Sequence, residues 1–380
     1  MKWEIAKLGK IAIIRTGKLD SNAAVIGGRY PFFTCDPNTL SIDVWAYDTE
    51  AVLLAGNNAS GNYTAKYYKG KFNAYQRTYI IESTNEEKLN IRYLCYALNQ
   101  QLQLLKTMSS GSTTKFLTVR MLDNLDIPLL GINIQTQIVN ILSAYDDLIE
   151  NNQKQIKLLE EAARRLYKEW FVDLRFPGHE NTKIVDGVPE GWQWCKVRDV
   201  ADINSSALPK NYKEDFIDYV DLGSVRCGHM ETRTRYNLNE APGRAKRCAK
   251  DGDIIWGMVR PNLKAYALVT NPKETDVFST GFAVLSAKKV PYSYLYCAVT
   301  QEEFVGYLVN ATNGAAYPAV KPVHFEVADI LKPDDKVLEQ FHSVADSIYR
   351  KKEALENQNH NLRESRDLIL PKLMSGEVEV

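Results

Sequence analysis

The second half of this chain repeats the first half. Residues 111–161 align with residues 314–364 without a gap, and identical residues are spread along the whole alignment. Similarity at a fixed offset means that one structural unit occurs more than once. The chain is therefore expected to contain two units of similar plan, one after the other. The identical pairs include Gly111 and Gly314, Asp126 and Asp329, Ile127 and Ile330, Gln137 and Gln340, Glu150 and Glu353, Gln155 and Gln358, Leu159 and Leu362, and Glu161 and Glu364.

The first part of each unit has the pattern of a mixed globule. In the first unit, runs such as AVLLAG and RTYIIES are rich in strand-forming residues and alternate with Gly, Asn and Ser. One helical stretch, residues 87–106, interrupts them. With 380 residues, of which 45% are hydrophobic, the chain is long enough for two or three domains. The expected fold class is α/β, with α and β elements mixed in each globule.

A long helical pattern follows each globule. After Pro128 and Gly131 the first pattern continues without a break until Pro177. Steps of alternately four and three residues trace an almost wholly apolar line along it, and this mean spacing is that of a coiled-coil seam. The first seam consists of Ile138, Leu142, Tyr145, Ile149, Asn152, Ile156, Leu159, Ala163, Leu166 and Trp170. The second seam consists of Phe341, Ala345, Ile348, Lys352, Leu355, Asn359, Leu362, Arg366, Ile369 and Leu373.

The two seams are expected to pack against each other as an antiparallel coiled coil. A chain that runs globule, helix, globule, helix can pair its helices in this way, which gives an internal pseudo-two-fold repeat. Asn152 and Asn359 then become candidates for a buried polar pair that fixes the register. Asp334 or Asp335 can cap the second helix, and Pro371 is expected to disrupt or end it. The alternative is that each helix packs separately on its own globule.

These patterns divide the chain into four parts. Residues 1–130 form the first globule, and residues 131–176 form the central long helix, which acts as a spacer. Residues 177–332 contain a linker and the second globule. Residues 333–380 contain the C-terminal long helix and a tail.

Positive charge is concentrated in the globules, although the formal net charge of the chain is zero. Residues 51–81 combine three lysines, one arginine and five tyrosines with no acidic residue, and residues 226–264 have a large excess of basic residues. Such surfaces suit double-stranded DNA, because neutralised phosphates release counterions and Arg or Asn side chains can read base edges. A solvated surface or a site for an acidic protein is the alternative.

Motifs for covalent chemistry are missing from the sequence. It contains no G-x-x-x-x-G-K loop, no H-E-x-x-H, no G-x-S-x-G and no [DN]-P-P-[YF]. The PDDK run at residues 333–336 has some similarity to a nuclease metal site, but capping of the following helix explains its acidic residues. The six cysteines are scattered without a C-x-x-C pair. We expect no catalytic residue, no metal and no cofactor bound by this chain.

The termini and apolar runs predict a cytoplasmic protein. The first residues lack the long apolar core and cleavage site of a signal peptide. No apolar run approaches the roughly 20 residues that span a bilayer.

The order of motifs resembles one known family. A Trp near the start is followed by SSGSTTKFLTVRMLDNLDIPLL, by the helix end RLYKEWFVDLRFPG, by VPEGWQWCKVRDVADI and by the terminal LILPKLMSGE. Together these segments look like the specificity subunit of a type I restriction-modification system. The resemblance covers essentially the whole chain.

This resemblance implies a non-catalytic DNA-recognition subunit. Each globule would be a target recognition domain that reads one half of a split, asymmetric DNA site, and the paired helices would set the gap. Two modification subunits, which bind S-adenosylmethionine and methylate adenine at N6, would dock mainly on the helices. Restriction subunits, which act as motor and nuclease with ATP and Mg²⁺, would complete the restriction form.

Candidate DNA-binding residues come from the basic segments and from two corresponding loops. SSGSTTK is small, polar and basic, which allows close approach to phosphate, and TNGAAYP takes its place in the second unit. A plain surface turn is the alternative for the first loop. The candidates in the first globule are Asn57, Asn58, Ser60, Lys66, Tyr67, Lys69, Arg77, Ser112, Thr113 and Lys115. Those in the second are Arg226, Arg233, Arg235, Arg260, Asn262, Lys264, Asn313, Tyr317 and Lys321.

Two other classes of function stay open at this point. One is a free-standing, sequence-specific DNA-binding regulator of the same architecture, which would bind its site without a methyltransferase. The other is a scaffold in which the coiled coil matters and the basic faces do not.

Overall fold

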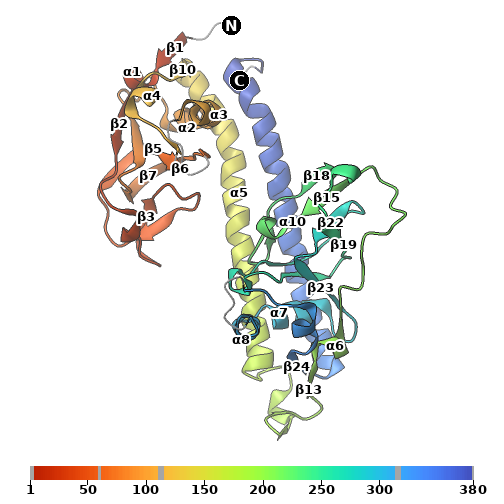
Figure 1. Cartoon of the computed structure of the whole chain (residues 1–380). Coiled ribbons are helices and arrows are strands. Elements are labelled where there is room, and N and C mark those ends of the chain that lie inside the picture. The colour runs from red at the N-terminus through yellow and green to blue at the C-terminus, as the bar shows by residue number, and fades with distance from the viewer. Residues whose placement is uncertain (1–3, 59–60, 110–114, 313–317, 379–380) are drawn as a thin grey trace. The chain divides into compact units, whose positions relative to one another are not determined.

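The computed structural model describes residues 4–58, 61–109, 115–312 and 318–378 (Figure 1). The chain divides into two compact units. Unit 1 contains residues 1–151 and 358–380, and unit 2 contains residues 152–357. Each unit combines one mixed α/β globule with a stretch of α5 (Ile132–Tyr167) and a stretch of α10 (Asp335–Ser375).

A six-stranded sheet forms the centre of the unit 1 globule. In order across the sheet, its strands are β2 (Ala12–Thr16), β8 (Thr78–Ser83), β5 (Tyr47–Ala55), β7 (Ala65–Ala74), β3 (Tyr30–Phe33) and β4 (Leu40–Ile42). The central strand β5 is buried on both faces, because Val52 and Leu54 belong to one core cluster while Ala51 and Leu53 belong to another. A buried strand of this kind explains the continuous apolar run in the sequence.

Helices connect this sheet to α5. Asn90 caps α2 (Ile91–Gln100), because its Oδ1 accepts a hydrogen bond from N of Tyr93 at 3.1 Å. α3 (Leu102–Met108) begins after Gln101, so the single helical stretch expected at residues 87–106 is two helices. Further elements include β1 (Glu4–Lys7), α1 (Leu8–Ile11), α4 (Val119–Asp123) and β10 (Asp126–Leu129), and β1 pairs antiparallel with β10 just before α5.

Unit 2 contains two four-stranded sheets. The first has the order β14 (Ala201–Ile203), β23 (Phe282–Ala287), β20 (Ile254–Gly257) and β21 (Tyr266–Leu268). The second has the order β18 (Thr234–Asn237), β15 (Phe216–Val220), β22 (Asp276–Ser279) and β19 (Ala245–Arg247). Trp256 of β20 is fully buried, and its Nε1 donates a hydrogen bond to O of Val299 in α7 (Tyr292–Val299) at 3.0 Å. This contact ties the first sheet to the helices of the unit.

Strand pairing repeats between the units, as the sequence predicts. β13 (Gln193–Lys196) pairs antiparallel with β24 (Asp329–Lys332) just before α10, as β1 pairs with β10 before α5. β23 pairs with β14 and β20, as β8 pairs with β2 and β5. In chain order, α6 (Val197–Val200), α7, α8 (Glu302–Asn310) and α9 (Pro322–Glu326) take the places of α1, α2, α3 and α4. The expected pair of similar mixed α/β domains is therefore confirmed.

The two long helices pack against each other in unit 1. Leu142 of α5 lies in the same core cluster as Leu373 of α10. Further along α5, Oδ1 of Asp146 lies 2.7 Å from NH1 of Arg366. Residue numbers rise along α5 while those of the partners fall along α10, so the segments are antiparallel.

The same arrangement holds in unit 2. Oε1 of Glu160 lies 2.8 Å from Nζ of Lys352. Further along α5, the ring centroids of Tyr167 and Phe341 are 6.2 Å apart. Every residue of both predicted seams is buried or half-buried, which confirms the face that the heptad pattern selected. The alternative of two separately packed helices is wrong.

The ends of the helices differ in part from expectation. Asp334 caps α10, because its Oδ1 accepts hydrogen bonds from N of Lys336 at 3.0 Å and N of Val337 at 3.1 Å. The expectation that Pro371 disrupts or ends the helix is wrong, because α10 continues to Ser375. Leu373 is 1% exposed in the core of unit 1, and this packing offsets the hydrogen bond lost at proline.

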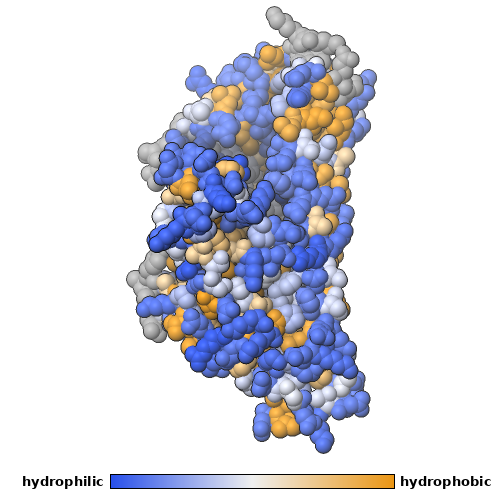
Figure 2. Space-filling view, turned by 90° about the vertical axis from the view of Figure 1, so that its right-hand side faces the viewer, coloured by the Kyte–Doolittle hydropathy of each residue, from blue (hydrophilic) through white to orange (hydrophobic). Residues whose placement is uncertain are grey.

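Polar groups dominate the surface drawn in Figure 2, with hydrophobic residues scattered among them. Among the described helices, none combines the length and the apolar composition of a membrane-spanning segment.

Candidate nucleic-acid interface

Both globules continue their central strand in the same way, and this defines the candidate interface. In unit 1, β5 leads into β6 (Asn57–Asn58), which pairs antiparallel with β9 (Lys115–Phe116). In unit 2, β20 leads to Val259, which forms an antiparallel bridge with Ala319. We call residues 56–58 and 115–117 the loop end of unit 1, and residues 258–264 and 318–320 the loop end of unit 2.

A backbone hydrogen bond recurs at the two loop ends. N of Leu117 donates to O of Gly56 at 2.8 Å, and N of Val320 donates to O of Met258 at 2.9 Å. The two loop ends therefore correspond to each other in three dimensions as well as in sequence.

Several predicted residues gather at the loop end of unit 1. Asn57 and Asn58 line a cavity of about 490 Å³ together with Asp36. Nζ of Lys66 donates hydrogen bonds to O of Asp36 at 3.3 Å and to Oγ1 of Thr39 at 3.2 Å, so Lys66 reaches the same loop. Burial lowers the pKa of Lys66, and the charge of Asp36 opposes that effect. The complete lining is Ser21, Thr34, Cys35, Asp36, Pro37, Leu40, Asn57, Asn58 and Tyr75.

One polar atom of this cavity lacks a partner. Oδ1 of Asn57 is buried and accepts no hydrogen bond within the described part of the chain. Unpaired buried acceptors are uncommon, and leaving this oxygen without a donor costs free energy. Arg77, another predicted residue, is exposed beside the loop end, and its carbonyl accepts a hydrogen bond from N of Gly56 at 2.8 Å.

Tyr67 and Lys69 are held elsewhere. Both side chains contact Glu50: the Tyr67 hydroxyl donates to Oε1 at 3.0 Å, and Nζ of Lys69 lies 2.9 Å from Oε2. Burial, followed by the hydrogen bond to Glu50, raises the pKa of Tyr67 to about 12. Neighbouring residues of a strand point to opposite faces, which separates Tyr67 from Lys66.

The loop end of unit 2 contains a turn of predicted residues. One turn of 3₁₀ helix, Pro261–Leu263, lies between Arg260 and Lys264. Asn262 within this turn is exposed. Nζ of Lys264 lies 2.6 Å from Oε1 of Glu302. Arg226 of β16 (Val225–Arg226), which pairs with β17 (His229–Met230), is exposed next to this turn, because N of the following Cys227 donates to O of Lys264 at 2.8 Å.

Arg233 and Arg235 form ion pairs with buried carboxylates. Nε of Arg233 lies 3.1 Å from Oδ1 of Asp276, and Nε of Arg235 lies 2.9 Å from Oδ1 of Asp218. The Arg235 hydrogen bond lowers the pKa of Asp218. Both arginines therefore stabilise the second sheet of unit 2, whatever else they contact.

The other predicted residues have varied positions. Lys321 is exposed at the start of α9. Ser60, Ser112, Thr113, Asn313 and Tyr317 lie outside the described residues.

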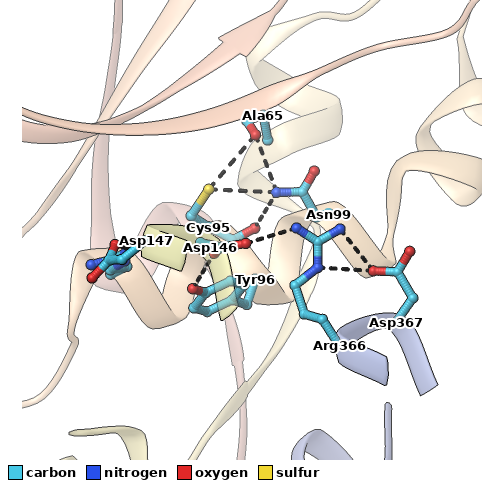
Figure 3. Close-up of polar contacts among 9 residues, drawn as sticks. Ala65, Cys95, Tyr96, Asn99, Asp146, Asp147, Arg366 and Asp367 are labelled. Carbon is cyan, nitrogen blue, oxygen red and sulfur yellow. Dashed lines mark hydrogen bonds and ion pairs between the residues drawn. The ribbon is translucent and has the colours of Figure 1, made fainter. Parts of the chain in front are cut away.

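Unit 1 also has a larger cavity, of about 890 Å³, lined mainly by residues of α2, α5 and α10, and Figure 3 shows polar contacts among residues of this lining. The hydroxyl of Tyr96 donates to Oδ2 of Asp146 at 2.5 Å, and NH1 of Arg366 donates to Oδ1 of the same carboxylate at 2.7 Å. NH2 of Arg92 lies 2.7 Å from Oδ1 of Asp147. Four acidic residues outnumber two arginines in the lining, so phosphate is disfavoured here and the contacts hold the globule on its helices.

A cluster of charged residues has the same holding role in unit 2. His229 in β17 contacts both long helices: its Nε2 lies 3.3 Å from Oε1 of Glu160, and its Nδ1 lies 2.9 Å from Oε1 of Glu356. Nζ of Lys352 donates to O of Gly228 at 2.8 Å. Hydrogen bonds to Glu160 and Glu356 raise the pKa of His229 to about 9. The cluster fixes the hairpin that carries Arg226.

Sequence reasoning missed this cluster, and it also missed two exposed apolar residues at the loop ends. Phe116 is 39% exposed, and Leu263 is 57% exposed. Neither shows a sequence signal, because a single apolar residue near a turn is common. No group of three His, Cys, Asp or Glu side chains in the described ranges is arranged to hold a metal ion.

Comparison with known proteins gives a consistent result. The family model described as "Type I restriction modification DNA specificity domain" matches residues 1–161. The type I restriction enzyme EcoDI specificity subunit of Escherichia coli is 26% identical, over 99% of this chain and 88% of that protein. The MjaIX specificity subunit of Methanocaldococcus jannaschii is also 26% identical, over 76% of this chain and 68% of that protein.

A solved structure shares the fold. The crystal structure of a type I restriction-modification S subunit from M. genitalium has a TM-score of 0.65 and 16% identity, over 98% of this chain and 96% of that chain.

Each unit joins an α/β domain to antiparallel helices, and each has a loop end with asparagine and cationic residues, which are residue types that suit contacts with DNA. The similarity to specificity subunits extends along the whole chain. Residues 1–161 match the model of the DNA specificity domain of type I restriction-modification systems, and the chain is similar along its length to specificity subunits of this family. Members of this family are non-catalytic components that recognise DNA and assemble with the other subunits of their system.

Proposed function

We propose that this subunit reads a bipartite, asymmetric DNA site and directs adenine-N6 methylation or cleavage by its partner subunits. The observation that carries the proposal is the loop end that occurs once in each unit. The two loop ends share a backbone arrangement but not side chains, since unit 1 has Asn57, Asn58 and Lys115 where unit 2 has Arg260 and Asn262. Different side chains on the same framework favour two different half-sites.

The helices supply the spacing in this proposal. α5 has 36 residues and α10 has 41 residues. At a rise of 1.5 Å per residue, α5 is about 54 Å long, which exceeds the roughly 34 Å of one duplex turn. Paired helices of this length are stiff enough to keep a constant gap between two half-sites.

Two modification subunits with S-adenosylmethionine are the partners that we propose for methylation. Restriction subunits that use ATP and Mg²⁺ would add cleavage. In this arrangement the chain binds no cofactor itself, and the assembled complex acts on DNA in the cytoplasm.

Charge reversal at residues within and beside the loop ends tests the proposal. Lys66→Glu with Lys115→Glu alters unit 1, and Arg226→Glu with Arg260→Glu alters unit 2. Each double variant should weaken specific DNA binding of the assembled complex by about tenfold or more and reduce the salt dependence, because phosphate contacts are lost. Lys10→Glu and Lys183→Glu are matched controls, since both lysines are exposed and distant in sequence from the loop ends.

Mapping N6-methyladenine in a host with and without this chain gives the site itself. A split motif that disappears without the chain, and disappears in either double variant but not in the controls, is the expected result. Full binding and methylation by both double variants would reject the loop ends as the DNA-binding surface. Specific binding by the isolated chain, without any methylation that depends on it, would favour a free-standing regulator.

A further inference from the structure

An exposed apolar side chain stands at the loop end of each unit. Phe116 lies beside Lys115 in unit 1, and Leu263 lies beside Asn262 in unit 2. Their exposed fractions are 39% and 57%. Single exposed apolar residues are ordinary, but these two lie at corresponding ends of duplicated domains, among the groups most suited to DNA.

The backbone holds Leu263 away from the core of unit 2. Arg260 has φ 50° and Lys264 has φ 54°, which is the left-handed region that residues with a Cβ adopt at a cost in free energy. Hydrogen bonds maintain this geometry: N of Arg260 donates to O of Pro318 at 2.8 Å, and N of Leu263 donates to O of Arg260 at 2.8 Å. Pro261 within the turn is buried, so the turn is anchored on one side and exposed at Asn262 and Leu263.

Strand geometry also holds the side chain of Phe116 away from the core of unit 1. Its backbone pairs with Asn57 in β6. The next residue, Leu117, is 4% exposed and belongs to the main core of unit 1. Because successive side chains of a strand alternate in direction, Phe116 points outward where Leu117 points inward.

The surroundings decide which ligand these side chains suit. The residues next to Leu263 include Arg260, Asn262 and Lys264, and the residue before Phe116 is Lys115. An apolar pocket on a protein partner would leave these polar and cationic groups poorly matched. DNA offers phosphates for the cations and one apolar group on its major-groove base edges, the C5-methyl group of thymine.

We propose that Phe116 and Leu263 each contact the C5-methyl group of a thymine, one in each half of the recognised site. This inference rests on the proposed function and adds a base and a chemical group to each loop end. It makes Phe116 and Leu263 residues that determine specificity, and it requires at least one thymine in each half-site.

Replacement of thymine by deoxyuridine tests the contact directly, because only the methyl group is removed. The complex with its modification subunits is used, and each thymine of the split motif is replaced in turn. We expect one position in each half-site where the replacement weakens binding by the wild-type complex about fourfold, the worth of one buried methyl group. In the Leu263→Ala complex, replacing thymine by deoxyuridine should no longer weaken binding at one of these two positions. In the Phe116→Ala complex, the replacement should no longer weaken binding at the position in the other half-site.

A matched control and the contrary outcomes distinguish a failure of the thymine contacts from a failure of the proposed function. Leu238→Ala removes another exposed leucine of unit 2, 37% exposed, and should leave both sensitive positions unchanged. A half-site without thymine, or positions whose sensitivity survives in both alanine variants, would overturn the inference and leave bipartite recognition intact. If Leu263→Ala prevents subunit assembly and leaves the effect of the deoxyuridine replacements unchanged, Leu263 contacts a protein instead. Absence of any site-specific binding by the wild-type complex would reject the proposed function itself.

Discussion

Replacing Lys352 with methionine should destabilise unit 2 by about 3 kcal/mol. The side chain of Lys352 is 9% exposed, and its Nζ lies 2.8 Å from Oε1 of Glu160 and 2.8 Å from O of Gly228. Removing one partner of a buried ion pair costs about 3–5 kcal/mol, because the other charge is left uncompensated. The lower end of this range applies here, since Glu160 keeps its contact with His229.

A second variant separates the charge effect from packing. Glu160→Leu combined with Lys352→Met removes both charges, and the loss should fall to about 1 kcal/mol because no buried charge stays unpaired. Lys351→Met is the matched control: Lys351 is exposed on the same helix, and its replacement should change stability by less than about 0.5 kcal/mol.

Urea unfolding monitored by tryptophan fluorescence measures these differences. Trp256 is fully buried in unit 2, and Trp170 and Trp192 pack in the same core cluster, so the signal reports mainly on that unit. The urea midpoint should fall for Lys352→Met with an unchanged slope. A loss below about 1 kcal/mol, or a double variant no more stable than Lys352→Met, would refute the view that this lysine compensates a buried charge.

Four further outcomes follow from the same structure. The pKa of His229 is raised from 6.5 to about 9, so its stabilisation of unit 2 is complete below pH 6.5 and is lost as the pH rises through 9. With solvent screening of a side chain that is 41% exposed, this amounts to about 1 kcal/mol, and His229→Gln should remove that pH dependence from urea midpoints. Arg235→Ala should mainly lower the melting temperature of the chain, because Asp218 loses its partner, and its effect on DNA affinity should be the smaller one. Burial raises the pKa values of Cys95 and Cys297 to about 12, so mass spectrometry after maleimide treatment at pH 7 should find exposed Cys227 modified first. Deleting one heptad from α5 between Asp146 and Glu160, and one from α10 between Lys352 and Arg366, should shorten the gap in the methylated motif by about three base pairs or abolish recognition, whereas an unchanged gap would reject the spacing role.

The sequence could predict those parts of the fold that depend on the local periodicity of residues along the chain. The offset between Gly111 and Gly314, continued into both helices, identifies the duplication without any knowledge of contacts. The heptad spacing identifies the buried face of α5 and α10, because side-chain direction in a helix follows from position alone. Pro371 shows the limit of such reasoning, since tertiary packing around Leu373 outweighs the local preference for a helix end.

The partners of charged side chains could not be predicted in the same way. Arg233 and Arg235 satisfy every local criterion for phosphate binding, yet Asp276 and Asp218 lie next to them through strand pairing. Strand pairing of this kind depends on which segments meet in the sheet, and a single sequence does not contain that information. Exposure of Leu263 likewise depends on left-handed backbone at Arg260 and Lys264, residues that do not usually adopt it.

The polar residues in the second seam also have a role that the heptad pattern alone does not show. Lys352 and Arg366 occupy seam positions where an apolar residue would be expected, and each forms an ion pair with an acidic residue of α5 within its own unit. Two heptads separate Glu160 from Asp146 on α5, and two heptads separate Lys352 from Arg366 on α10, so both pairs fit one antiparallel register.

A slip of one heptad would remove both ion pairs at once. Lys352 would then face Gln153 or Tyr167, and Arg366 would face Gln153 or Val139, none of which carries a negative charge. Each slipped register would leave Lys352 and Arg366 without a carboxylate on α5, so that only Glu356 and Asp367 of α10 itself would pair with them, while the apolar seam residues would still meet one another. An apolar heptad seam permits several registers, and unpaired charge excludes the wrong ones. Under the spacing role proposed above, the gap between the two half-sites would change with register, and these two ion pairs would select one register.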